Sequence, residues 1–300
     1  MRTRRGNYKF LDKFSWYLPG VGGMFALLAW LLVGALLGGI ATLILTAVAG
    51  QSAGAEYGTI LSYPIMFIPP MIYASLKSNS LSMDNSGCKL DNNHFAPVGA
   101  LMCVLLAIVG TLALGFWADG ITSLLPPMPP VLEEALKGLT SGNFFINFLA
   151  VSIFAPVCEE WLCRGMVLRG LLVRARIKPV WAIVISAAFF ALIHLNPWQA
   201  IPAFLMGCLF GYVYWRTGSL KLTMLMHFTN NTFALILGHI DSMKDMESWS
   251  DVLGGPIYYI LVAATLILTA LVILGFSKVK LGAKEGNLDT IPSVFDSYEA

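Results

Sequence analysis

The sequence predicts an all-α, polytopic membrane protein with about eight transmembrane helices and both termini in the cytoplasm. Its 300 residues are 57% hydrophobic and only 12% charged, with a mean hydropathy of +0.73. Soluble domains, in contrast, are about 25% charged. The apolar residues gather in runs of about the length that crosses a bilayer. Lysine and arginine fall almost entirely on one side of those runs, which predicts their orientation.

The chain begins with a segment that mixes basic and aromatic side chains, residues 1–19. This composition is typical of a short helix lying on an anionic leaflet. The first apolar run, residues 24–48, is longer than the hydrophobic region of a signal peptide. The tripeptide Ala47-Val48-Ala49 resembles a signal-peptidase site, so a cleaved signal stays an alternative to a first membrane span.

Seven further apolar runs are predicted to span the membrane: 56–76, 98–118, 143–170, 179–195, 198–215, 220–239 and 254–276. The polar residues after Ser277 are predicted to form a disordered tail. We divide the chain into three parts. Residues 1–142 hold the interfacial segment and the first three spans, residues 143–240 hold four spans, and residues 241–300 hold the last span and the tail.

The distribution of charge sets the topology. With a cytoplasmic N-terminus, 17 of the 19 lysines and arginines face the cytoplasm, and only Lys137 and Lys244 face the other side. This satisfies the positive-inside rule. The formal net charge of +2 gives no indication of a nucleic-acid partner. The five cysteines form no Cys-x-x-Cys pair and predict neither a disulfide framework nor a thiolate metal cluster.

Three ionisable residues lie inside the run that begins at residue 143. Glu160 and Arg164 are four residues apart, with the acid first, and are expected to form an ion pair that holds the helix in register. Glu159 is left without a partner on its own helix. Charges inside a span are costly, so they indicate a functional site. The structural alternative is a buried network of these three side chains.

The fourth and fifth spans are predicted to form a hairpin that turns near Ile177. Glu159 lies 18 residues before this turn and His194 lies 17 after it, so equal helical rises place them at nearly the same height. Phe190 shares a face with His194 and would form an apolar wall. Asn196-Pro197 is expected to break the helix just past His194.

The sixth and seventh spans bring two more polar residues to this depth. His227 follows the turn at Gly218 by nine residues, and Asn231 lies one turn further on the same face. If Arg169 marks the membrane interface, Glu159 lies about 15 Å below that surface at 1.5 Å per residue. By the same rise, His227 lies about 14 Å below the turn at Gly218. An acid, two imidazoles and a carboxamide are therefore predicted to meet in one layer.

Three motifs in this region, in order, resemble those of the CPBP family: Glu159-Glu160-x-x-x-Arg164, Phe190-x-x-x-His194 and His227-x-x-x-Asn231. The resemblance covers about residues 145–240. The family includes CAAX prenyl proteases and bacterial proteins linked to bacteriocin processing and self-immunity. The resemblance implies an intramembrane glutamic endopeptidase with eight spans and a cavity open to the cytoplasm, so that residues 143–240 form the catalytic core.

By position, the resemblance makes Glu159 the water-activating residue and His194 its partner. His227 and Asn231 correspond to the pair that holds the oxyanion. Glu160, Arg164 and Phe190 are expected to support these four. The expected partners are a membrane-anchored peptide or protein substrate, prenylated or of the bacteriocin leader type, and the lipid bilayer of the cell membrane. No cofactor is expected for this chemistry.

Two other interpretations remain open from the residues. Glu159, His194 and His227 could form a His₂Glu zinc site with Glu160 as the base, although the chain has no His-Glu-x-x-His sequence. Carboxylates and histidines within spans also serve proton-coupled transport. Transporters of that kind are often built from two matching halves, and this chain has no internal repeat.

Overall fold

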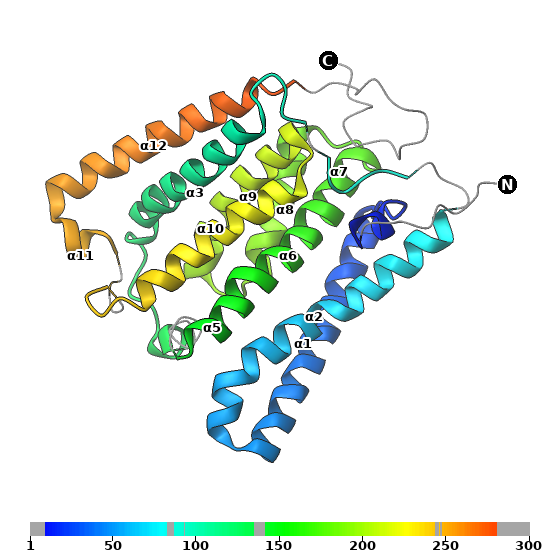
Figure 1. Cartoon of the computed structure of the whole chain (residues 1–300), viewed down its shortest axis with the longest axis horizontal. Helices are drawn as coiled ribbons and strands as arrows, with labels where there is room; N and C mark the ends of the chain where they lie inside the picture. Colours follow the sequence, from blue (N-terminus) through cyan, green and yellow to red (C-terminus); the bar gives the residue numbers. More distant parts are fainter. Residues whose placement is uncertain are drawn as a thin grey trace.

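The computed structural model describes residues 10–82, 87–92, 94–134, 142–243, 246 and 248–280. Helices dominate, and none of these residues forms a β-strand (Figure 1). The separate helices are α1 (Val21–Ala49), α2 (Gln51–Leu81), α3 (Ala100–Thr122), α8 (Pro179–Leu192), α9 (Pro197–Thr217), α10 (Leu220–Gly238), α11 (Ser250–Leu253) and α12 (Gly255–Ser277). The predicted all-α class is confirmed.

One further helix, Phe144–Val173, is continuous but changes its winding along its length. Its segments are α5 (Phe144–Asn147), a π-helical stretch (Phe148–Phe154), α6 (Ala155–Glu160), a second π-helical stretch (Trp161–Leu168) and α7 (Arg169–Val173). Glu159 and Glu160 thus lie at the end of the short α-helical part between two wider turns. Such π-helical turns are rare and occur frequently at functional sites.

Every predicted apolar run coincides with a helix. Five helices are long and apolar enough to cross a membrane: α1, α2, α3, Phe144–Val173 and α12. The break before Pro197 is confirmed, but it begins earlier than predicted: α8 ends at Leu192, so His194 lies in the connection to α9 and not in the helix. The tail was predicted to be disordered after Ser277, but Val279 is buried and the backbone N–H of Lys280 donates to the carbonyl oxygen of Ala96. The rest of the tail, residues 281–300, lies outside the described residues.

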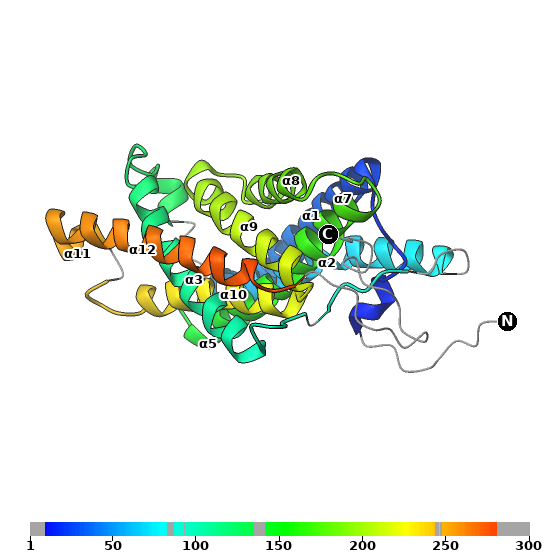
Figure 2. The same cartoon turned by 90° about the horizontal axis from the view of Figure 1, so that it is seen from above.

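The helices form a central group flanked by two pairs. The central group consists of Phe144–Val173, α8, α9 and α10, while α3 with α12 and α1 with α2 make the flanking pairs (Figure 1). Seen from above, α8 lies at one face of the molecule and α10 at the opposite face (Figure 2). The α1–α2 pair contacts the central group chiefly through α2. Side chains of α2 are therefore placed to reach the middle of the molecule.

Arg169 does not mark the membrane interface, contrary to the expectation from the sequence. It is completely buried and donates hydrogen bonds to the backbone carbonyls of Phe14, Tyr17 and Cys88. Three carbonyl acceptors compensate for the lost hydration of the guanidinium. Phe14 and Tyr17 are buried as well. This part of the N-terminal segment packs against the protein, whereas the sequence predicted a helix on the bilayer surface.

Glycines allow α1 and α2 to pack closely. A Cβ atom on Gly34 would overlap the carbonyl oxygen of Met66, and one on Gly38 would lie 2.7 Å from the carbonyl oxygen of Ser62. Small residues are commonly found where membrane helices approach this closely. A Cβ on Gly39, by contrast, would meet no atom within 4 Å.

We therefore expect Gly34→Ala to destabilise the protein by about 1–3 kcal/mol, the usual cost of overpacking. Gly39→Ala is the matched control in the same helix and is expected to melt like the wild type. Thermal unfolding in detergent, followed by tryptophan fluorescence, measures both. Equal melting temperatures for the two variants would show that the α1–α2 contact is not tight at Gly34.

Candidate active site

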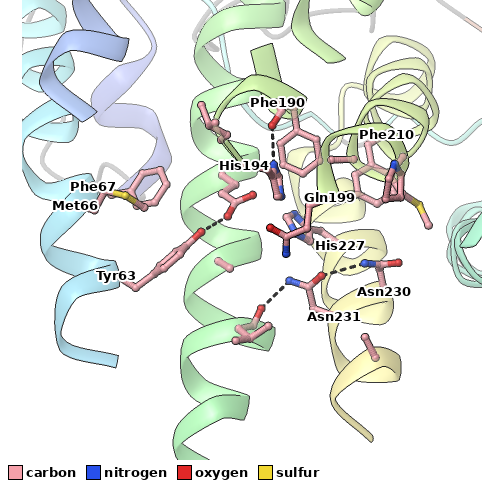
Figure 3. Close-up of a pocket in the computed structure, with 18 of the residues that line it drawn as sticks. Tyr63, Met66, Phe67, Phe190, His194, Gln199, Phe210, His227, Asn230 and Asn231 are labelled. Atoms are coloured by element: carbon pink, nitrogen blue, oxygen red, sulfur yellow. Dashed lines mark hydrogen bonds between the residues drawn. The ribbon is translucent and has the colours of Figure 1, made fainter. Parts of the chain in front are cut away.

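A cavity of about 540 Å³ lies between α2, Phe144–Val173, α8, α9 and α10 (Figure 3). Five of the seven predicted site residues line it: Glu159, His194, His227, Asn231 and Phe190. The other two, Glu160 and Arg164, lie behind the wall and are completely buried. On the helix Phe144–Val173 the lining residues are Val151, Ala155 and Glu159, and residues 161–172 are buried. Along this helix the cavity therefore does not extend toward α7.

Glu159 receives its hydrogen bond from a different helix. The hydroxyl of Tyr63, on α2, donates to Oε1 of Glu159 (Figure 3). Glu159 as a residue is only 8% exposed, and its Oε2 is buried with no hydrogen-bond partner among the described residues. Oε2 of Glu160 is likewise buried without a partner among the described residues, so what distinguishes Glu159 is that it lines the cavity. A ligand that reaches Oε2 of Glu159 would not have to displace an existing hydrogen bond from that oxygen.

His194 lies in the irregular segment between α8 and α9. Its Nδ1 is 2.8 Å from the carbonyl oxygen of Phe190, and the two rings meet edge to face with centroids 4.9 Å apart. Since a carbonyl can only accept, Nδ1 carries the proton and Nε2 keeps its lone pair when the ring is neutral. Phe190 therefore both walls the site and sets the tautomer of His194.

His227 is bound to Glu160 and not to Glu159. Oε1 of Glu160 accepts from Nη1 of Arg164 at 2.7 Å and lies 3.1 Å from Nδ1 of His227. All three side chains are buried. The predicted Glu160–Arg164 pair is confirmed, and it carries the additional contact to α10. Because Nδ1 of His227 donates to the carboxylate, a neutral His227 has no proton on Nε2.

Arg164 connects the helices around the cavity. Its Nη2 donates to the carbonyl oxygen of Gly207 on α9 at 3.1 Å. Its guanidinium lies over the rings of Phe190 on α8 and Phe210 on α9, at 4.6 and 5.3 Å from their centroids. Aromatic faces stabilise a cation that has lost its water. One side chain thus links α8 and α9 to the helix that carries Glu160.

Asn231 has a fixed orientation in the cavity wall. Its Nδ2 donates to the carbonyl oxygen of Val151 at 2.8 Å, and its Oδ1 accepts from Nδ2 of Asn230 at 3.1 Å (Figure 3). Because the Val151 carbonyl can only accept, the nitrogen must lie on that side. One N–H of the amide remains for a ligand.

The proposed zinc triad does not assemble. Nowhere in the described part of the chain do three His, Cys, Asp or Glu side chains come close enough to hold a metal ion. Nδ1 of His194 is bound to the Phe190 carbonyl, and Nδ1 of His227 is bound to Glu160. The alternative that Glu159, His194 and His227 share a zinc ion therefore finds no support in the geometry.

Sequence reasoning missed four polar residues of the cavity: Thr59, Tyr63, Gln199 and Asn230. Each is a polar side chain within or at the start of an apolar helix, and buried groups of this kind usually have a hydrogen-bonding partner. Asn230 was noticeable as the neighbour of Asn231, and Gln199 as the third residue after the helix break. Nothing in the sequence places Tyr63 at the depth and angle of Glu159.

Fold and site together define a multi-pass α-helical membrane protein with a cavity lined by acid, imidazole and amide groups. Residues 141–233 match the family described as Type II CAAX prenyl endopeptidase Rce1-like. These residues are thus a domain of the CAAX prenyl endopeptidase family, which is a family of proteases, and the resemblance read from the three motifs is confirmed. No curated protein and no solved structure matches the chain.

Proposed function

We propose that the protein is an intramembrane endopeptidase that hydrolyses a peptide bond of a membrane-anchored substrate, with a water molecule activated by Glu159. One observation carries this proposal. Glu159 lines a cavity of about 540 Å³, where its Oε1 accepts a hydrogen bond from Tyr63 and its Oε2 is buried without a partner among the described residues. His194 and Asn231 line the same cavity and add an acceptor and a donor.

The proposed reaction follows from these groups. Oε2 of Glu159 takes one proton of the water, while Nε2 of His194 accepts a hydrogen bond from the O–H that remains and so orients the oxygen. The oxygen attacks the scissile carbonyl, and the free N–H of Asn231 donates to the oxyanion. The proton held by Glu159 then passes to the leaving nitrogen as the C–N bond breaks. His227 adds a donor to the oxyanion only as an imidazolium, because its Nδ1 is bound to Glu160.

We also propose that eight helices cross the membrane with both termini in the cytoplasm, in the cell membrane. Five helices have the length and composition for crossing. The other three would be α8, α9 and α10, which carry the rest of the cavity. Helix α8 has 14 residues, or about 21 Å of helix, so it would reach a bilayer surface only together with residues 193–196. The distribution of basic residues supports this orientation: with the buried Arg164 and Arg169 left out, 15 lie on the cytoplasmic side and 2 on the other.

The substrate we propose is a peptide next to a hydrocarbon anchor. The cavity wall combines the polar groups above with apolar side chains such as Met206 and Phe210. A second, more open groove of about 450 Å³ follows α1 and α2 and shares Tyr63 and Met66 with the cavity. The family's name points to a prenylated Cys-aliphatic-aliphatic-X end.

The test uses the purified full-length protein in liposomes with three internally quenched peptides. One ends in farnesylated Cys-aliphatic-aliphatic-Met, the second is the same sequence without the lipid, and the third is a leader-type peptide with a transmembrane anchor. We expect cleavage of at least one, with the cut bond identified by mass spectrometry. If all three stay intact and the liposomes instead show proton-driven uptake, the protein is a transporter.

A further inference from the structure

We propose that Gln199 is a second hydrogen-bond donor to the scissile carbonyl, and that its side-chain nitrogen faces the oxyanion together with Asn231. This inference rests on the proposed function. Gln199 belongs to none of the three family motifs, and its role follows from the way the connection between α8 and α9 is hydrogen-bonded.

Asn196 controls the orientation of Gln199. As the residue that caps α9, Asn196 accepts the backbone N–H of Gln199 through its Oδ1 at 2.8 Å. Its Nδ2 donates to the carbonyl oxygen of His194 at 3.1 Å and to Oε1 of Gln199 at 2.7 Å. The His194 carbonyl can only accept, so the amide nitrogen of Asn196 must lie there. This fixes Oε1 of Gln199 on the side of Asn196.

The other end of the Gln199 amide is then a donor directed away from Asn196. Its Nε2 carries two N–H groups, and no described residue accepts from them. Gln199 lines the cavity, and its side chain reaches into the space between His194, His227 and Asn231 (Figure 3). An amide held through its oxygen has little freedom to turn, so the donor is oriented before substrate binds.

Without Gln199, the oxyanion would receive the one remaining N–H of Asn231. Stabilising the oxyanion of acyl transfer depends on N–H or O–H groups that already point at the developing charge. Asn231 gives one of its two N–H groups to the Val151 carbonyl. A neutral His227 has no N–H left, because Nδ1 donates to Glu160. Gln199 supplies a second donor, from α9.

The backbone of the connection supports this role. Leu195 has a φ of +57°, a left-handed conformation that is unfavourable for a leucine. Strain of this kind persists where the surrounding structure requires it, often at functional sites. Here it lets the chain turn between His194 and Asn196, so that one short segment positions both the imidazole of His194 and the amide of Gln199.

The experiment compares Gln199→Met with the wild type on whichever quenched peptide the protein cleaves. Methionine keeps the length of the side chain and the backbone cap but has no donor. We expect kcat to fall about 10²-fold or more, the usual effect of losing one oxyanion donor, with KM within about twofold. Gln199→Glu keeps the shape of the side chain and replaces the N–H donor by a second acceptor oxygen. We expect its kcat to fall by the same factor as in Gln199→Met. Gln51→Met is the matched control, since Gln51 is exposed at the start of α2.

The outcomes are distinct. Wild-type kcat in both Gln199 variants, or a loss confined to KM, would overturn the assignment of Gln199 and leave the proposed function standing. If a fall in kcat in Gln199→Met comes with a lower melting temperature, Gln199→Glu decides: unchanged kcat in that variant overturns the proposal. If the wild type cleaves none of the peptides, both proposals fall together.

Discussion

Replacing Glu159 by glutamine is expected to lower kcat for peptide cleavage by about 10²–10⁴-fold, the contribution typical of a positioned general base. An amide cannot take the proton of water at neutral pH. Its oxygen still accepts the hydroxyl of Tyr63, so the contact between α2 and the central group should persist. We therefore expect a folded protein that binds substrate with unchanged KM and does not cut it.

The measurement is the initial rate of cleavage of the quenched peptide, with KM from the same titration and the melting temperature of each variant. Glu56→Gln is the matched control, because Glu56 is an exposed carboxylate near the start of α2. It should retain wild-type kcat. Cleavage by Glu159→Gln at more than about a tenth of the wild-type rate would remove Glu159 from the role of base.

The helices could be predicted from composition because a bilayer leaves the chain little choice. Every backbone polar group must be satisfied within its own span, so long apolar runs become helices. The ion pair between Glu160 and Arg164 follows equally simply, since residues four apart lie on one face of a helix. The depth of Glu159, His194 and His227 could be approximated by counting residues from the turns between spans.

Depth alone does not give the direction in which a side chain points. His227 lines the same cavity as Glu159, but its Nδ1 contacts Glu160 and not Glu159. The π-helical stretches on both sides of Glu159 and Glu160 change the angle between successive residues, and the sequence gives no sign of them. The partners of the two adjacent acids are therefore set by helix packing that no local pattern records.

Long-range contacts account for the other differences. Tyr63 lies 96 residues before Glu159 and reaches it only because α2 packs beside that helix. Arg169 looks like a surface charge in the sequence, since basic residues follow it toward the turn. It is buried because the chain before α1 and the Cys88 segment fold over it and supply carbonyl acceptors. A periodic pattern cannot indicate which distant backbone will cover a residue.

The largest loss of stability is expected from Arg164→Met. The substitution keeps most of the aliphatic stem but leaves the Glu160 carboxylate completely buried, with only His227 facing it. Breaking a buried ion pair from one side usually costs about 3–5 kcal/mol. The Gly207 carbonyl also loses its donor, and Phe190 loses the guanidinium stacked on it. We expect the apparent melting temperature to fall on the order of 10 °C.

Two comparisons show that the cause is the unpaired charge. Lys221→Met also removes an ion pair, but Lys221 is 61% exposed and its bridge to Asp91 at 2.7 Å is a surface contact. That loss should be below about 1 kcal/mol. The double variant Glu160→Leu with Arg164→Met removes both charges, so it should melt above Arg164→Met alone. If the double variant melts lower than the single one, the ion pair contributes through packing, and the charge of Glu160 is not what destabilises Arg164→Met.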